Sequence, residues 1–270
     1  MILLAARVLE QRGINIGTRS VATFRVLPGP FVVLPGFATP SSVAVVAASY
    51  LPENPKILEG GAYLGKNSVK LAKIWPKAQI YSFEPVPELA EKTKTNTRTF
   101  PNIHVYELAL SDKNGTATMY LSELVAKPDQ TYQSSSLFAP SEFLRKAPRI
   151  QYKKQINVPT TTIDAWAKKN SVDHIDLLYL DIQGAELAAM KGAPEIMKTV
   201  QVVLAEIEFV EVYTGQPLYG EVRSWLEEQG FRMIAGSFDP SDPTSPVLGA
   251  SSWFADAIFV RARPATVMRR

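Results

Sequence analysis

The stretch from Lys56 to Glu84 constrains the fold more than any other part of the chain. It reads as a short apolar strand ending at Glu59, a glycine-rich turn, an amphipathic helix, and a second apolar strand over 79–83. Two strands joined through a helix lie parallel with a right-handed crossover, and ligands bind beyond their carboxyl ends. Because Glu59 and Glu84 both lie at those ends, the stretch predicts a ligand site at one edge of a parallel sheet.

The turn in this stretch suits a nucleoside that carries an anionic group. Gly61 and Gly65 let the backbone approach a ligand closely, and the start of the next helix offers N–H groups to an anion. Glu84 suits a ribose diol because one carboxylate can accept two hydroxyl hydrogen bonds. The spacing departs from the G-x-G-x-x-G of dinucleotide sites. It resembles the first two motifs of class I S-adenosylmethionine (SAM) methyltransferases, and the alternative is a glycine turn in another doubly wound domain.

Composition excludes several other kinds of site. The chain has 270 residues, enough for one sizeable domain with a small addition, and a net charge of +3, too small to predict a nucleic-acid partner. With no cysteine there is no disulfide, thiolate metal site or cysteine nucleophile. Two histidines, His104 and His174, leave little for zinc or a serine–histidine mechanism. Since neither a signal peptide nor a run of 18 apolar residues is visible, we expect a cytoplasmic protein without a membrane span.

The remaining pattern alternates strands and helices. Strands are expected over 103–110, 116–121, 175–180, 202–207, 231–234 and 254–260. The third strand would end at Ser111 and Asp112, and the gap before the last strand is expected to be a flexible loop. This order predicts an α/β, Rossmann-like fold of the class I type, with a mostly parallel central sheet, an antiparallel last strand and helices on both faces.

We expect three parts along the chain. Residues 1–50 form an extension of short strands, turns and a helix that Ser41 and Ser42 could cap; it either covers the pocket, packs at a homo-oligomer interface, or decorates the periphery. Residues 51–263 form the main domain, with a polar, irregular insertion at about 122–160, and 264–270 form a basic tail.

Several motifs in the correct order resemble the FkbM-type methyltransferases, together covering residues 56–261. The acid-x-G-A-x-x-G motif is matched by EGGAYLG at 59–65, F-E-P by 83–85, and A-x-S-D-x-x-G by 109–115. The most specific piece, D-x-(E/Q)-G-x-E-x-x-x-x-x-G-A, is matched by DIQGAELAAMKGA at 181–193. Tyr63 and Tyr179 depart from the asparagine and lysine that are common at those positions of the family.

This resemblance implies SAM as the methyl donor and gives each motif a role. The glycine turn would hold the methionine carboxylate, Glu59 the ammonium, Glu84 the ribose hydroxyls, and Asp112 the adenine amino group. Asp112 could instead cap the turn before Asn114. The expected cofactor-binding residues are Glu59, Gly61, Ala62, Tyr63, Gly65, Asn67, Ser68, Glu84, Pro85, Ser111, Asp112 and Asp181.

The resemblance also implies methylation of a hydroxyl on a small molecule such as a sugar or natural product. A hydroxyl acceptor sheds a proton, for which Asp181 is the first candidate base and Glu206 the second. Asp181 could instead cap the next helix or bind the methionine amino group. No metal is expected, because no dense carboxylate cluster argues for one.

Two other functions stay open at this point. The basic segment 145–154, with five cations and an interleaved tyrosine, would suit methylation of a nucleic acid, although a solvated charged face explains it better. Tyr63 and Tyr179, at positions where the family often has polar residues, would suit a SAM-fold binding protein without turnover.

Overall fold

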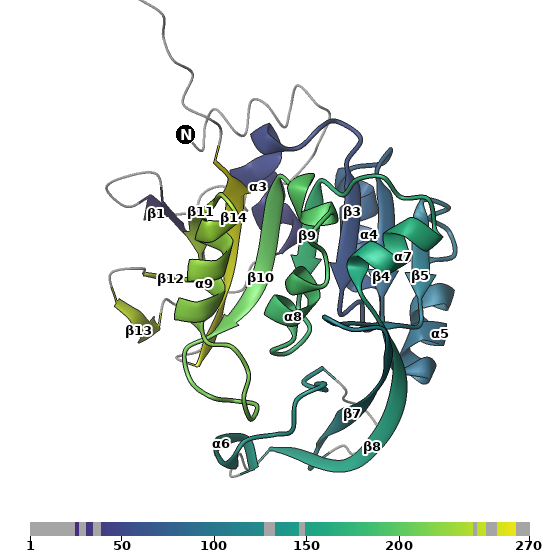
Figure 1. Ribbon diagram of the computed structural model, residues 1–270, viewed down its shortest axis with the longest axis vertical. Helices are drawn as coiled ribbons and strands as arrows, with labels where there is room; N and C mark the ends of the chain where they lie inside the picture. The colour runs from purple at the N-terminus through teal and green to yellow at the C-terminus, as the bar shows by residue number, and fades with distance from the viewer. Residues whose placement is uncertain are drawn as a thin grey trace, which may run out of the picture.

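The computed structural model describes residues 25–26, 31–34, 39–126, 133–145, 149–239, 242–246 and 253–262. Within them, the central sheet has nine strands in the order β1-β2-β11-β14-β10-β9-β3-β4-β5 (Figure 1). Its strands are β1 Arg25–Val26, β2 Val32–Val33, β3 Lys56–Gly60, β4 Gln79–Phe83, β5 Ile103–Tyr106, β9 Leu177–Leu180, β10 Val202–Glu208, β11 Phe231–Gly236 and β14 Phe254–Arg261.

The pairing of these strands confirms the predicted fold class. β5, β4, β3, β9 and β10 are parallel neighbours, and β14 lies antiparallel between β10 and β11. The four residues of β9 are apolar and buried, as a strand covered on both faces requires.

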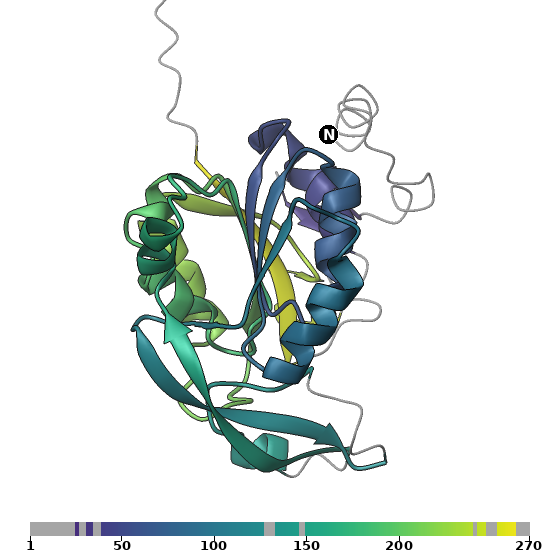
Figure 2. The same cartoon turned by 90° about the vertical axis from the view of Figure 1, so that its right-hand side faces the viewer.

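Helices cover both faces of the sheet (Figure 2). They are α3 Pro40–Ala47, α4 Lys66–Ile74, α5 Pro87–Thr97, α6 Glu142–Arg145, α7 Ile163–Lys169, α8 Glu186–Lys191 and α9 Tyr219–Glu228. One apolar core includes Trp166, Leu187 and Leu226 from α7, α8 and α9, and the other includes Val43 and Leu71 from α3 and α4. Among the described residues, no helix is long and apolar enough to cross a membrane.

The predicted third strand, 103–110, is wrong as one element. β5 ends at Tyr106, and the chain then leaves the central sheet, so that β6, Ala109–Leu110, pairs with β8 in a separate three-stranded sheet. β7, Gly115–Leu124, and β8, Ile150–Thr161, form a long antiparallel ribbon in that sheet. The prediction of an irregular insertion at 122–160 is therefore wrong for much of its length. The ribbon lies across the carboxyl ends of the central strands (Figure 1).

The basic segment is divided between elements of this insertion. Arg145 ends α6 and Lys154 lies on β8, where its Nζ is 2.9 Å from Glu123 Oε1. Lys146 lies outside the described residues. Of the cations in this segment, Lys154 is thus paired with an acid of the neighbouring strand.

Part of the predicted flexible loop before the last strand is also regular. β12, Phe238–Asp239, and β13, Asp242–Pro246, pair antiparallel, whereas 247–252 lie outside the described residues.

The described part of residues 1–50 belongs to the core. β2 lies parallel to β11, and Leu34 and Val43 are fully buried. Thr39 is the N-cap of α3, since its hydroxyl accepts a hydrogen bond from the Ser42 N–H, and Ser42 completes a capping box by accepting one from the Thr39 N–H at 3.2 Å. The predicted capping role is thus confirmed for Ser42, which acts from the third position of the helix. The basic tail 264–270 lies outside the described residues, and the proposed cap or oligomer role of residues 1–50 stays a prediction.

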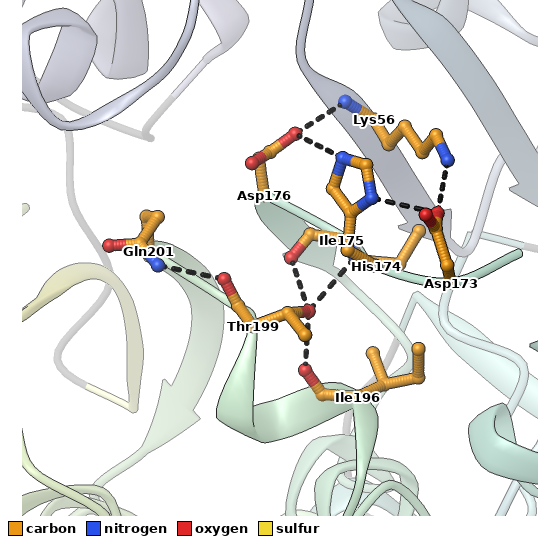
Figure 3. A network of polar contacts seen from close by, with 8 residues as sticks. All are labelled: Lys56, Asp173, His174, Ile175, Asp176, Ile196, Thr199 and Gln201. Atoms are coloured by element: carbon orange, nitrogen blue, oxygen red, sulfur yellow. Dashed lines mark hydrogen bonds and ion pairs between the residues drawn. The ribbon is translucent and has the colours of Figure 1, made fainter.

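The amino ends of β3 and β9 are joined by a polar network (Figure 3). Asp176 Oδ2 accepts a hydrogen bond from the Lys56 main-chain N–H at 2.8 Å, and Lys56 Nζ lies 2.5 Å from Asp173 Oδ1. His174 lies between the two aspartates, with Nδ1 2.8 Å from Asp173 and Nε2 3.7 Å from Asp176. This network lies at the end of the strands opposite to their carboxyl ends.

Candidate functional site

A cavity of about 540 Å³ lies at the carboxyl ends of β3, β4, β9 and β10. Its sheet-side wall includes Glu84 after β4, Asp181 after β9, and Glu206 and Glu208 at the end of β10. The opposite wall comes from the second sheet and the segment 133–137. The position agrees with the edge predicted for a ligand site. Its volume is within the range of small-molecule pockets.

The glycine turn brings the main chain against the end of β9. Gly61 has φ +82°, and a Cβ there would lie 1.9 Å from the Asp181 carbonyl oxygen. Gly65 has φ +72°, and its Cβ would lie 2.8 Å from Thr97 Cγ2. Both positions therefore require glycine, for conformation and for space. Gly61, Ala62 and Tyr63 line the cavity, whereas Gly65 supports the turn from behind.

Glu84 lies on the cavity wall, and its carboxyl group is fixed by two main-chain N–H groups. Its Oε2 accepts a hydrogen bond from the Tyr63 N–H at 2.8 Å, and its Oε1 accepts one from the Val86 N–H at 3.0 Å. Each oxygen keeps one lone pair for a hydroxyl. Burial raises the pKa of Glu84 to about 7, against the two N–H groups that lower it. Pro85, beside it, also lines the cavity.

Glu59 is not on the cavity wall. Its Oε2 accepts hydrogen bonds from Ser68 Oγ at 2.5 Å and Ser82 Oγ at 2.7 Å, and burial raises its pKa. The carboxylate and Ser68 thus stabilise the turn from beneath. Direct contact of either residue with the methionine part of SAM stays a prediction.

Ser111 and Asp112 are not on the cavity wall either, against the prediction. The Ser111 N–H donates to the Thr161 carbonyl oxygen at 3.0 Å, within the second sheet, and the Asp112 side chain is 48% exposed beside Lys113. The reason is the early end of β5, which removes these residues from the edge of the central sheet. Leu108, Ala109 and Leu110 line the cavity in their place, and they offer an apolar surface to a base.

The first turns of α4 supply polar groups to the same cavity. Lys66, Asn67 and Lys70 line it. The Asn67 amide donates to the Tyr179 hydroxyl at 3.3 Å, and Tyr179 is buried below the helix. Asn67 therefore reaches the cavity as predicted, with its amide oriented by Tyr179.

Asp181 and Glu206 are brought together as predicted, and Gln183 connects them. Gln183 Nε2 lies 3.0 Å from Asp181 Oδ1 and 3.0 Å from Glu206 Oε1. Burial raises the pKa of Asp181, and burial together with the charge of Asp181 raises that of Glu206 well above its ordinary value. A carboxylate with a raised pKa is a stronger base while it is ionised, so whichever residue of the pair is deprotonated can accept a proton from an alcohol.

Two more buried acids lie behind this pair. Glu186 accepts hydrogen bonds from the Ile182 N–H at 2.7 Å and the Gly184 N–H at 2.9 Å, which gives it a structural role at the start of α8. Burial raises the pKa of Glu186 to about 8 and raises that of Glu208 further above its usual range. Within the part of the chain that the structure describes, no group of three His, Cys, Asp or Glu residues is arranged to hold a metal ion.

Sequence reasoning did not find Gln183 or Tyr213 as site residues. Gln183 follows Asp181 in a recognisable motif, but Tyr213 reaches it from the loop after β10, and only the fold shows that contact. The apolar wall formed by Met119, Leu137 and Ile150 was also missed, because these residues belong to an insertion without a transferable motif.

Comparison with known proteins identifies the chemistry of the chain. The family model of the methyltransferase FkbM domain matches residues 59–233. The 2-O-methyltransferase NoeI of Sinorhizobium fredii is 28% identical over 163 residues, covering 60% of this chain and 67% of that protein. Methyltransferase sdnD of Sordaria araneosa is 24% identical over 199 residues, covering 67% and 75%. A solved structure of Aeropyrum pernix fibrillarin with bound S-adenosyl-L-methionine has a TM-score of 0.41 at 17% identity, covering 78% and 69%.

Proposed function

The chain belongs to the FkbM methyltransferase family, and on that premise we propose that this SAM-dependent enzyme methylates a hydroxyl group of a small molecule. The observation that supports the proposal best is one cavity whose wall contains the carboxyl groups of Glu84, Asp181 and Glu206, which lie at the same edge of the central sheet. Glu84 follows β4 and Glu206 lies near the end of β10, three strand spacings away, or about 14 Å. That span leaves room for a donor and an acceptor side by side.

The β3–β4 half of the cavity fits the donor. Glu84 would hold the ribose hydroxyls, while the close turn at Gly61 and the start of α4 would face the methionine carboxylate. The apolar residues 108–110 would pack against adenine. Bound SAM supplies an electrophilic methyl group on a sulfonium. The residues of this half contribute orientation, which is the main requirement of such a displacement.

The β9–β10 half fits the acceptor. Asp181 and Glu206 both line it, and an ionised carboxylate there can take the proton that the acceptor hydroxyl loses. Asp181 is our first choice as base, because its main-chain carbonyl touches the glycine turn and so places it nearest the donor half.

Methyl transfer can be tested with methyl-labelled SAM and a panel of acceptors that includes free sugars, glycosides, hydroxylated natural products, amines and RNA. We expect label on a hydroxylated small molecule, and a loss of about 100-fold or more in Asp181→Asn. Asp173→Asn, at the opposite end of the sheet, is the matched control and should keep full activity. Label on RNA or amines alone would contradict the proposal, and so would full activity in both Asp181→Asn and Glu206→Gln.

A further inference from the structure

Gln183 lies at the bend between β9 and α8, on the cavity wall. Its main chain has φ +57°, and Gly184 follows with φ +94°. A positive φ at a residue other than glycine is unfavourable and persists where surrounding contacts hold it. The Gln183 carbonyl oxygen is one such contact, since it accepts a hydrogen bond from Ser136 Oγ at 2.6 Å.

The side-chain amide of Gln183 is held at both ends. Nε2 lies 3.0 Å from each of Asp181 Oδ1 and Glu206 Oε1, while Oε1 lies 2.8 Å from the Tyr213 hydroxyl. The Tyr213 hydroxyl is also 2.9 Å from the Ser134 carbonyl oxygen, which can only accept. Tyr213 has one hydroxyl hydrogen and faces these two acceptors. Because the Ser134 carbonyl oxygen also accepts a hydrogen bond from the Tyr152 hydroxyl at 2.7 Å, we assign the Tyr213 hydrogen to Gln183 Oε1. This contact directs both amide hydrogens toward the two acids.

The surroundings of the acid pair make this donor important. The charged groups that act on Glu206 are Asp181 beside it, Glu208 from β10, Asp256 from β14, and Glu186 from α8, and all of them are acids. Tyr213, with Tyr152 next to it, faces the pair from the other side. A glutamine supplies hydrogen bonds to two carboxylates without adding a further negative charge.

We propose that Gln183 is a positioning residue, which holds Asp181 and Glu206 together and keeps one of them ionised, and that Tyr213 sets the orientation of its amide. The inference rests on the proposed function, because Gln183 matters for catalysis only if Asp181 or Glu206 is the base that deprotonates an acceptor. The ionisation of the pair, however, can be measured without any methyl acceptor.

The test is a pH titration of the ligand-free protein by NMR of ¹³C-labelled carboxyl groups, with the pair assigned from Asp181→Asn and Glu206→Gln. In Gln183→Met, which keeps the length but removes the donor, we expect the first apparent pKa of the pair to rise by about one unit or more. Tyr213→Phe should shift it in the same direction by less.

Gln201→Met is the matched control. Gln201 precedes β10 at the amino end of the sheet, where its side-chain amide donates to the Thr199 carbonyl oxygen at 2.8 Å, so the same substitution is made away from the acid pair. The titration should then stay as in the wild type. If Gln183→Met does not fold, Tyr213→Phe carries the test.

An unchanged titration in a folded Gln183→Met, or in Tyr213→Phe when that variant carries the test, would overturn the proposal. An equal shift in Gln201→Met would do the same, because it would trace the effect to a general loss of stability rather than to the Gln183 amide. If the apparent pKa of the pair shifts in Gln183→Met but the wild type methylates no hydroxyl, the positioning role is supported and only the proposed function is contradicted.

Discussion

At the amino end of the central sheet, Asp173 and Asp176 lie beside Lys56 and its main-chain N–H, whereas at the carboxyl end Asp181 and Glu206 lie beside other acids. The hydrogen bond from Lys56 is the largest cause that lowers the pKa of Asp173. Burial raises the pKa of Asp181 and of Glu206. Acids of two kinds thus lie on either side of β9 in the sequence: Asp173 and Asp176 just before the strand, and Asp181 just after it.

The difference shows what each end contributes. At the amino end, Asp176 joins β3 to β9 by accepting a hydrogen bond from the Lys56 main-chain N–H, so it contributes to stability. Buried acids at the carboxyl end reduce the stability of the ligand-free protein, and a group that costs stability is retained where it serves a ligand or a reaction. This contrast supports the carboxyl end as the functional end independently of any motif.

The largest change in the stability of the ligand-free protein is expected when the pH is raised. The pKa of Glu84, about 7, and that of Glu186, about 8, both lie above the ordinary value of 4.5. Between those values the folded protein binds more protons than the unfolded chain, so its stability falls as pH rises from 5 to 8. Glu84 alone accounts for about 3 kcal/mol of this loss. Denaturant unfolding of the ligand-free protein at pH 5 and pH 8 measures this change in the free energy of unfolding. A rise in stability from pH 5 to pH 8 would contradict the proposed difference between the two ends of the sheet.

Neutralising one acid at each end should change stability in opposite directions. Asp181→Asn removes a partly buried negative charge from an acidic surrounding and should raise the free energy of unfolding at pH 8 by about 1 kcal/mol. Asp176→Asn weakens the acceptor of the Lys56 N–H and should lower it by about 1 kcal/mol. Denaturant unfolding of the two variants gives both values. Changes of the same sign would show that the two ends do not differ as proposed.

The smallest effect is expected at Asp173. Its side chain is 76% exposed, so solvent and salt screen its ion pair with Lys56. Asp173→Asn should leave the melting temperature at neutral pH almost unchanged, and any small decrease should disappear in high salt. Thermal melts at low and high ionic strength test this. A clear loss of stability at high salt would assign the amino-end network a larger role than its exposure allows.

The sequence predicted the parts of the fold that depend on neighbouring residues. The turn that contains Gly61, the strand before Asp181 and the helix after it are local patterns, and the structure has them where they are expected. The two acids Glu84 and Asp181 were correctly placed at one edge, because parallel strands end together.

The errors depend on contacts between distant residues. The residues 103–110 look like one apolar strand, and only pairing with β8 shows that the chain changes sheets after Tyr106. That change removed Asp112 from the cavity. Likewise, the two serines that turn Glu59 inward, and the Tyr213 hydroxyl that orients Gln183, are unrelated to those residues in the sequence pattern.

The central claim is that the carboxyl end of the sheet holds SAM through Glu84. Calorimetric titration of SAM into the wild type, Glu84→Ala and Asp176→Ala tests it directly. We predict that Glu84→Ala weakens binding by about 100-fold, since two hydrogen bonds to a charged acceptor are lost, and that Asp176→Ala binds like the wild type. Equal affinity of Glu84→Ala and the wild type would contradict the account.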